Sequence, residues 1–191
     1  MKNLPRGFTL IEMMTVVALI AIIGALAAPD LRAFVIRNKV AGVSNEFSAA
    51  LQQARALAVS RNSCMSLCVA SSNNAGTCMA NTVDDVNFLA TGWLIFQNPG
   101  CDAAKTDPED AVAGPILQQR SGEAGNYVLR ASASELNIVL FDPRGYANLA
   151  AVGNFQIEPP PGADASYRRT ICLDAAGRST VRQFVEDDPC T

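Results

Sequence analysis

Apolar residues run almost without a break over residues 8–28, and Glu12 is the one charged residue among them. A helix over this range would be roughly 30 Å long at 1.5 Å per residue, which is the thickness of the hydrocarbon core of a bilayer. Lys2 and Arg6 precede the run and Asp30 follows it, so the positive-inside rule leaves the amino terminus in the cytoplasm and exports the remainder. Because a carboxylate in lipid requires a partner, Glu12 is expected to have a function.

The next stretch, 29–62, has apolar residues at three- and four-residue spacing, which is typical of a helix with one buried face. The apolar positions of this stripe are Leu31, Val35, Val40, Val43, Phe47, Leu51, Ala54 and Ala58. Pro29 is expected to kink the helix or to release one of its hydrogen bonds, and Asn62 with Ser63 is expected to end it. We therefore predict one long helix whose half over 8–28 projects and whose half over 29–62 packs onto a domain.

Beyond the helix, the pattern changes to short runs that are rich in β-branched and aromatic residues. The predicted strands are 64–70, Gly92–Gln97, 127–131, 136–141, 155–158, 170–173 and 180–184. The sequence DPRG at 142–145 suits a type I turn, and the polar ranges 71–91 and 98–115 predict surface loops. The sequence thus predicts an α+β fold, in which the long helix packs on an antiparallel sheet or pair of sheets formed by a globular domain over 63–191.

Charge and composition exclude several classes of function. The chain has 191 residues, a formal net charge of −3 and no histidine. The negative charge argues against a globally basic nucleic-acid binder, and the lack of histidine excludes Ser-His-Asp catalysis and His-ligated zinc. No nucleotide-binding or metalloprotease motif is present, and Asp107, Glu109 and Asp110 offer too few oxygen ligands for calcium. We therefore predict no enzymatic activity, cofactor, metal or small-molecule substrate.

The cysteines indicate an oxidising compartment. Their number is even, and all of them follow the apolar run: Cys64, Cys68, Cys78, Cys101, Cys172 and Cys190. Because an exported chain with an even cysteine count is typical of disulfide-bonded proteins, we expect disulfides. A Cys68–Cys78 bond would close a short loop after the first strand. If 64–70 pairs antiparallel with Gly92–Gln97, Cys101 returns near Cys64.

The apolar run at the amino terminus has three interpretations. A secretory signal peptide would have its cleavage pattern at 25–27, but its apolar core is usually shorter. A simple signal anchor leaves Glu12 without a function. The third interpretation explains Glu12, because the sequence GFTLIE at 7–12, after a short basic leader and before Pro29, resembles the class III leader of type IV prepilins and pseudopilins.

This resemblance implies how the chain is processed. In that family a membrane aspartyl protease, the prepilin peptidase, removes the leader, here residues 1–7, by cutting between Gly7 and Phe8. The same enzyme methylates the new amino group of Phe8. Glu12 then becomes the fifth residue of the mature chain and is implied to pair with the amino terminus of a neighbouring subunit in the filament. Residues 8–28 would span the membrane before assembly and would form part of the filament core afterwards.

A second resemblance extends over nearly the whole chain. The sequences ALQQARALAVSRN, GWLIF, FDPRG and ICLDAAGRSTVRQF are similar to those of the H-type pseudopilin and minor-pilin family. It implies a pilin fold, a Gram-negative bacterium, and a path from the inner membrane, with one span and a periplasmic domain, to an extracellular pilus. The expected partners are the prepilin peptidase, the inner membrane and other minor and major pilins. A Cys172–Cys190 disulfide would fasten the C-terminal tail to a strand, as in many pilins.

Three functions fit this resemblance. We expect a minor type IV pilin that is incorporated near the tip of a pilus and supports pilus assembly. One alternative is an H-type pseudopilin of a type II secretion system. The other is a competence minor pilin that captures DNA for natural transformation.

The DNA alternative depends on four arginines near the C-terminus: Arg168, Arg169, Arg178 and Arg182. On a strand, Arg178 and Arg182 would point to the same face, and two or three arginines on one face can hold a phosphate backbone. The DNA-binding subgroup of the family has a Gly-Arg-x-Arg element in this region. This chain keeps Gly177 and Arg178, but Thr180 stands where the second arginine would be. The acidic residues that flank the patch and would repel DNA are Asp174, Glu186, Asp187 and Asp188.

Overall fold

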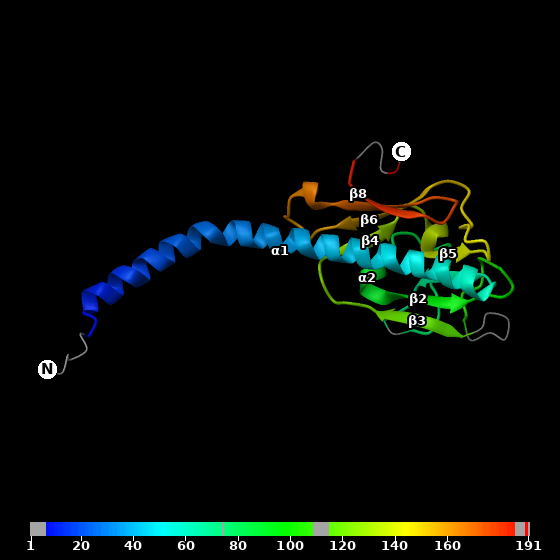
Figure 1. Cartoon of the computed structure of the whole chain (residues 1–191), viewed down its shortest axis with the longest axis horizontal. Helices are drawn as coiled ribbons and strands as arrows, with labels where there is room; N and C mark the ends of the chain where they lie inside the picture. Colours follow the sequence, from blue (N-terminus) through cyan, green and yellow to red (C-terminus); the bar gives the residue numbers. More distant parts are fainter. Residues whose placement is uncertain (1–6, 74, 109–114, 186–189, 191) are drawn as a thin grey trace.

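The computed structural model describes residues 7–73, 75–108, 115–185 and 190. Within them, a long helix, α1 (Leu10–Arg61), projects from a domain built of two antiparallel sheets, as Figure 1 shows. The first sheet has the strand order β3-β2-β1-β5, and the second has the order β4-β6-β7-β8. The strands are β1 Met65–Val69, β2 Gly92–Gln97, β3 Ile116–Ser121, β4 Val128–Ala131, β5 Ile138–Phe141, β6 Gly153–Glu158, β7 Arg169–Leu173 and β8 Ser179–Gln183. The short helices are α2 Phe88–Thr91, η1 Ser134–Asn137 and η2 Ala165–Tyr167.

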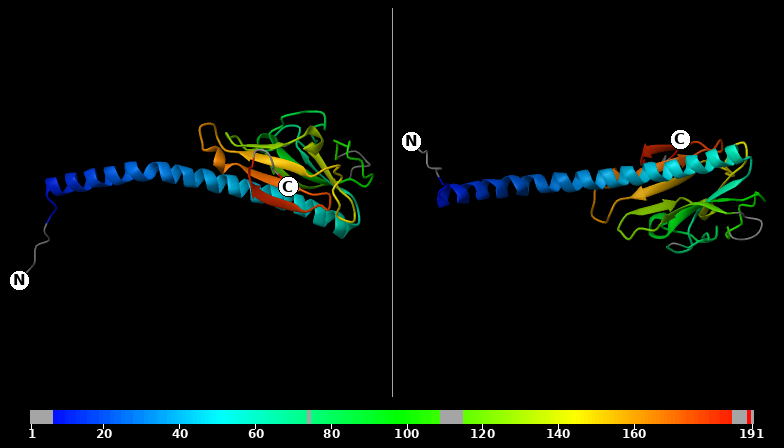
Figure 2. Two further views of the ribbon diagram at one scale, coloured as in Figure 1. Left: turned by 90° about the horizontal axis from the view of Figure 1, so that it is seen from above. Right: turned by 60° about the horizontal axis from the view of Figure 1, so that its bottom comes forward.

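Local chemistry sets both ends of α1. At its start, Thr9 is the N-cap and forms a capping box with Glu12. At its end, Asn62 adopts the left-handed conformation with φ 48°, and its N–H donates to the carbonyl of Ala58. The predicted end of the helix at Asn62 is therefore confirmed. Pro29 lies inside the helix without ending it, and the projecting half is curved, as Figures 1 and 2 show.

The packed half of α1 begins at Ile36, which is later than the sequence predicts. Leu31 and Val35 belong to the predicted buried stripe, but they are 63% and 56% exposed because the domain covers the helix only from Ile36 onward. The prediction is wrong for these two residues and is confirmed from Val40 to Ala58. The buried residues of α1 are Ile36, Val40, Val43, Ser44, Phe47, Ser48, Ala50, Leu51, Ala54 and Ala58.

Phe47 of α1 lies at the centre of the core and joins the two sheets. Its ring centroid is 5.2 Å from that of Trp93 in β2 and 4.9 Å from that of Phe155 in β6. A third ring, Phe88 of α2, lies 5.5 Å away, and all three contacts have the edge-to-face geometry that aromatic rings prefer. Since α1 contacts strands of both sheets, it closes one core that the two sheets share.

The first two strands pair as the expected Cys64–Cys101 bond requires. Strands β1 and β2 are antiparallel, with Met65 opposite Gln97 and Val69 opposite Trp93. On its other side β1 pairs with β5, so β1 is a central strand, and every residue in it is buried. In the second sheet, β7 is central in the same way, between β6 and β8.

Three predictions for the domain are corrected. Strand β3 was not predicted, because the sequence ILQQRS forms a half-exposed edge without a clear apolar face. The range 71–91 is predicted as a surface loop, but Phe88 and Leu89 are buried in α2, which Asn87 caps. The range 136–141 is predicted as a strand throughout, whereas its first residues belong to η1 and β5 begins at Ile138.

Disulfides join Cys64 to Cys101, Cys68 to Cys78, and Cys172 to Cys190. These are the pairings expected from the sequence. The first two connect the β1 region to the loops on either side of β2, and the third connects β7 to the C-terminal tail. A disulfide of this kind typically contributes about 2–4 kcal/mol to the free energy of unfolding.

Candidate assembly site and basic groove

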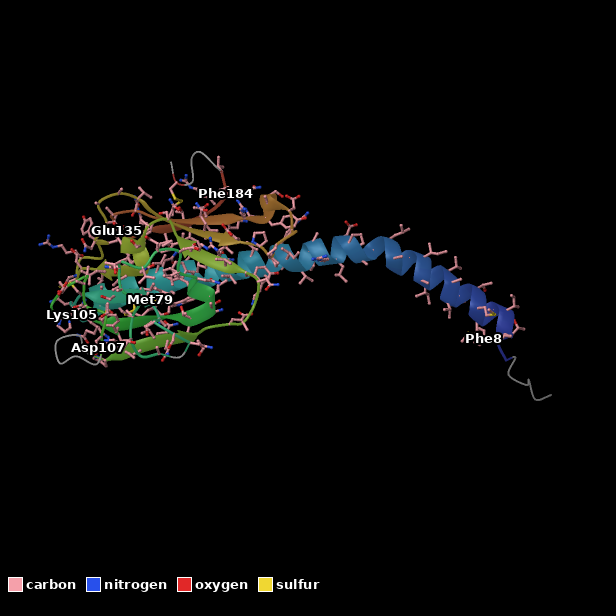
Figure 3. All side chains as sticks on the ribbon, turned by 180° about the vertical axis from the view of Figure 1, so that it is seen from behind. Phe8, Met79, Lys105, Asp107, Glu135 and Phe184 are labelled. Atoms are coloured by element: carbon pink, nitrogen blue, oxygen red, sulfur yellow. A yellow bond between two sulfur atoms is a disulfide. The ribbon has the colours of Figure 1, made fainter. Side chains whose placement is uncertain are left out.

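The projecting end of α1 begins just after the predicted cleavage bond. Gly7, Phe8 and Thr9 precede the helix and have no regular secondary structure. Phe8 is 84% exposed, and Figure 3 shows it at the far end of the helix from the domain. Because exposed segments outside regular structure are the preferred sites of proteolysis, the bond between Gly7 and Phe8 is open to a peptidase.

Thr9 holds the carboxylate of Glu12 within the chain. Oε2 of Glu12 accepts hydrogen bonds from the backbone N–H and the hydroxyl of Thr9, both at 2.8 Å. The backbone N–H of Glu12 donates in return to Oγ1 of Thr9 at 3.3 Å. The first turn of a helix also favours a negative charge through the helix dipole. These bonds employ Oε2, and a carboxylate has a second oxygen that can accept from an amino group of another chain.

The projecting half of α1 presents an apolar surface on all sides. Its exposed large apolar side chains are Leu10, Ile11, Met13, Met14, Val16, Val17, Leu19, Ile20, Ile22, Ile23, Leu26, Leu31, Phe34 and Val35. One window of 18 residues in α1 has a mean hydropathy of 2.5, and none of it is buried. Among the described residues, α1 is the helix whose length and composition suit a membrane span. An apolar surface of this size marks a membrane or protein interface.

A basic groove lies where α1 meets two turns of the domain. Its volume is about 690 Å³. It is lined by Arg55 of α1, Arg144 of the turn after β5 and Arg178 of the turn before β8. The other lining residues are Gln52, Ala56, Val59, Ser60, Gly177 and Ser179. With three guanidinium groups and no carboxylate among these residues, the groove suits an anion.

The two turns of the groove touch each other and α1. In each turn a glycine N–H donates to an aspartate carbonyl at 2.9 Å, Gly145 to Asp142 and Gly177 to Asp174. The predicted turn over 142–145 is therefore confirmed. A Cβ on Gly177 would lie 2.2 Å from the carbonyl oxygen of Gly145, so the contact between the turns requires glycine. Nε of Arg55 donates to the same carbonyl at 3.0 Å and fastens the turn to the helix.

Asp174 compensates part of the charge of Arg178. The backbone N–H of Arg178 donates to Oδ1 of Asp174 at 2.9 Å, and Nε donates to Oδ2 at 2.8 Å. These contacts, the backbone hydrogen bond first, hold the pKa of Asp174 below its usual value, so its carboxylate is ionised at neutral pH. The side chain of Arg178 is nevertheless 71% exposed, which leaves it accessible from the groove.

The four arginines predicted as a DNA patch do not lie together. Arg178 stands in the turn before β8, so the argument that it shares a strand face with Arg182 does not apply. Arg169 is the first residue of β7 and Arg168 directly precedes it, while Arg182 lies near the end of β8, where Arg169 is opposite Gln183. At about 3.3 Å per residue, the strand separates the two groups by roughly 13 Å.

Sequence reasoning missed the two arginines that accompany Arg178 in the groove. Arg144 occupies the predicted turn at 142–145, and Arg55 lies off the apolar stripe of the helix. Both features were visible in the sequence, but only the fold brings the turn and the helix next to each other. The acidic flank at Glu186, Asp187 and Asp188 lies outside the described residues.

The described residues include no group of three or more His, Cys, Asp or Glu side chains that could hold a metal ion. Of the acidic cluster in the sequence, Asp107 is described, whereas Glu109 and Asp110 lie outside the described residues. The structure therefore describes one of the three acidic residues and does not test the cluster as a site.

Comparison with known families gives two matches. The family described as type II transport protein GspH matches residues 43–177, and the prokaryotic N-terminal methylation motif matches residues 2–28. The type IV major fimbrial protein FimA of Dichelobacter nodosus is 48% identical over 46 residues, which is 24% of this chain. The matched part spans only 30% of that relative's length.

Two crystal forms of the type IV minor pilin FimU from Pseudomonas aeruginosa are similar in structure. One has a TM-score of 0.51 at 19% identity, covering 80% of this chain and 92% of FimU. The other has a TM-score of 0.48 at 18% identity, covering 74% and 90%. At this identity the first likeness supports the pilin fold, with its long helix and antiparallel sheets.

Proposed function

The chain belongs to the family described as type II transport protein GspH, and on this premise we propose that it is a minor type IV pilin, a structural subunit without enzymatic activity. It is incorporated near the tip of a pilus and supports assembly there. One observation carries the proposal. A single helix joins a wholly exposed apolar half, with Glu12 in its first turn, to a domain that covers it only from Ile36 onward. Such a helix is stable only in lipid or among other subunits.

The proposed processing begins at the N-terminal methylation motif. The prepilin peptidase cuts between Gly7 and Phe8 and methylates the amino group of Phe8, and this part of the proposal is supported by the motif match over residues 2–28. Residues 8–28 then hold the subunit in the inner membrane as a single span, with the domain in the periplasm. The disulfides fit an oxidising compartment. On assembly the chain moves into the extracellular pilus.

Glu12 directs the assembly step. While the subunit is in the membrane, Thr9 compensates the carboxylate through two hydrogen bonds at 2.8 Å. At the filament, the amino terminus of a neighbouring pilin supplies a cation to the same carboxylate. Because a buried charge without a partner is strongly disfavoured, this pairing sets the axial position of the incoming subunit.

The test follows pilus formation and protein secretion in the native bacterium. A strain without the chain receives the wild type, Glu12→Ala, or the control Glu135→Ala, which removes a carboxylate from the domain instead (Figure 3). We expect sheared pili to contain the wild-type chain beginning at N-methylated Phe8. Glu12→Ala should lower the number of surface pili severalfold, while Glu135→Ala should not. A chain that begins near Pro29 would overturn the proposal.

An H-type pseudopilin of a type II secretion system is the second candidate, and the family description favours it. The same strains distinguish a minor pilin from a pseudopilin. Loss of the chain should abolish pili and leave exoprotein secretion unchanged if it is a minor pilin. The reverse result would assign it to the secretion machine.

A DNA-binding competence pilin is the third candidate, and the basic groove favours it. In this case the phosphate backbone lies against Arg55, Arg144 and Arg178, because these three arginines line one groove. Arg144→Gln with Arg178→Gln should then abolish DNA retardation and natural transformation, whereas Arg168→Gln with Arg169→Gln should leave both unchanged. If neither pair alters DNA retardation, this candidate is wrong.

A further inference from the structure

A small polar pocket lies at the end of the domain that faces the projecting helix. Its volume is about 200 Å³, and it is lined by Arg37, Ser166, Tyr167, Arg169 and Gln183. These residues come from α1, η2, the start of β7 and the end of β8. Figures 1 and 2 show the orange segment that contains η2 beside α1 at this end. The pocket is therefore distinct from the basic groove, which lies at the other end of β8.

The lining of the pocket suits a phosphate group. Arg37 and Arg169 supply two guanidinium groups, and Ser166 and Tyr167 supply hydroxyls, with no carboxylate among the lining residues. Guanidinium groups bind tetrahedral oxyanions through paired, charge-assisted hydrogen bonds. A pocket with this lining is a better receptor for an anion than for a neutral or cationic group.

Arg37 is positioned by contacts to η2. Its Nη2 donates to the hydroxyl of Tyr167 at 3.3 Å, and its Cζ lies 4.7 Å from the centre of the tyrosine ring. An acid close to Arg37 is Asp164, whose Oδ1 accepts the N–H of Ser166 at 2.8 Å. Asp164 offsets part of the charge of Arg37, and Arg168, stacked over Phe184 at 5.4 Å, adds a further positive charge nearby.

The short distance to the expected membrane surface favours a lipid headgroup as the source of the phosphate. At 1.5 Å per residue, Arg37 lies roughly 13 Å beyond Ala28, the last residue of the predicted span. The headgroup layer extends about 5–8 Å beyond the hydrocarbon core, and membrane helices tilt by about 20° on average. Helical side chains also point toward the N-terminus, which here is the membrane side, and arginine extends its charged end toward the headgroups.

We propose that this pocket binds the phosphate of an anionic phospholipid headgroup in the leaflet from which the domain emerges. The proposal rests on the membrane anchorage of the proposed function. The bound headgroup holds the domain against the membrane surface before assembly. Incorporation into a filament must therefore break this contact as the subunit leaves the bilayer.

Native mass spectrometry of the full chain tests the proposal. The chain is released from nanodiscs that contain equal amounts of phosphatidylglycerol and phosphatidylcholine, and the bound lipids are counted. The test variant is Arg37→Gln with Arg169→Gln. Its matched control, Arg55→Gln with Arg144→Gln, changes the net charge equally at the far end of the domain. A third variant, Arg37→Lys with Arg169→Lys, keeps the charge, and circular dichroism checks the fold of each.

We expect the wild type and the matched control to retain phosphatidylglycerol in preference to phosphatidylcholine. The test variant should lose most of this preference, because both lipids carry a phosphate and the two guanidinium groups disfavour the choline cation that only phosphatidylcholine has. The lysine variant should keep part of the preference for phosphatidylglycerol. Equal losses in the test and control variants, or equal retention of the two lipids, would overturn the proposal. So would inorganic phosphate that displaces the lipid at matching concentration.

The result is independent of which filament the chain enters. If sheared pili lack the chain but the preference for phosphatidylglycerol persists, the proposed function fails and the pocket assignment stands. If an alkaline wash strips the chain from membranes, the anchorage itself fails, and the pocket assignment fails with it.

Discussion

Phe47 contributes to the domain through its position between both sheets. It is fully buried and touches rings from β2, β6 and α2. We predict that Phe47→Ala lowers the free energy of unfolding by about 3–5 kcal/mol, because it leaves a cavity where three elements meet. Chemical denaturation of the full chain in a neutral detergent measures the change. Phe34→Ala, at a helix position that is 61% exposed, should change it by less than about 0.5 kcal/mol. Equal effects would contradict the assignment of the core.

The ion pair between Lys39 and Glu123 predicts a dependence on pH. Nζ of Lys39 donates to Oε1 of Glu123 at 2.6 Å, and this contact, with a smaller contribution from Arg120, holds the pKa of Glu123 below the usual glutamate value of 4.5. A lowered folded-state pKa stabilises the fold above about pH 4.5 and loses that effect as the pH falls through the folded value.

Lys39→Gln should therefore be less stable than the wild type near pH 7, and the difference should be smaller near pH 3, where protonation of Glu123 weakens the ion pair. Both side chains are well exposed, so the difference should stay under about 1 kcal/mol and shrink at high salt. Denaturation at the two pH values measures it. A difference that is undiminished at the lower pH would show that Lys39 acts through packing and not through its charge.

Individual residues differ in how far the sequence reveals their role. Glu12 was identified from the sequence because a charge stands out in an apolar run and because GFTLIE at 7–12 resembles the prepilin leader. The groove of Arg55, Arg144 and Arg178 was not identified from the sequence, because its members are brought together only when two turns pack against α1. A contact between segments far apart in the chain leaves no periodic signal in either segment.

Among the elements, α1 and the turns depend on glycine in opposite ways. Gly42 lies on the exposed face of α1, with open space where its Cβ would be, and glycine is a poor helix former. Gly177 has φ 73° and would place a Cβ 2.2 Å from the carbonyl oxygen of Gly145. Gly42→Ala should raise the free energy of unfolding by about 0.5–1 kcal/mol, and Gly177→Ala should lower it by about 1–3 kcal/mol.

The two glycine variants control for each other, because each adds one methyl group to the same domain. Thermal unfolding of both in the same detergent gives the comparison. If Gly177→Ala is neutral, the two turns are further apart in solution than their contact at Gly145 indicates. If Gly42→Ala destabilises the chain, the face of α1 at this position is not exposed.

Elements with a strong local pattern were predicted, and elements defined by their neighbours were not. The stripe from Val40 to Ala58 predicts the packed helix, and the run over 64–70 predicts the strand β1. Strand β3 is an edge strand that depends on pairing with β2. The four residues of α2 depend on the cap from Asn87 and on burial of Phe88, neither of which is visible as periodicity.

At the scale of the whole molecule, the chain consists of two parts that require different surroundings. The part over 10–35 has almost no contact with the domain and exposes apolar side chains. Among the described residues, the domain contains the buried core, the disulfides and the hydrogen bonds of both sheets. The helix α1 is continuous through both parts, so a force applied to the projecting half is transmitted along it to the core at Phe47.

This division predicts that the domain folds without the projecting half. A shortened chain that starts at Asp30 keeps every buried residue of α1, since the first of them is Ile36. It should be soluble without detergent, and its Tm should lie within a few degrees of that of the full chain, because the removed residues contribute no buried area to the core.

A chain that starts at Ser48 loses Phe47 and the buried turns before it, and it should fail to give a cooperative transition. Differential scanning calorimetry separates these outcomes. If the chain from Asp30 melts far below the full chain, the projecting half stabilises the domain, and the two parts do not have separate roles in anchorage and folding.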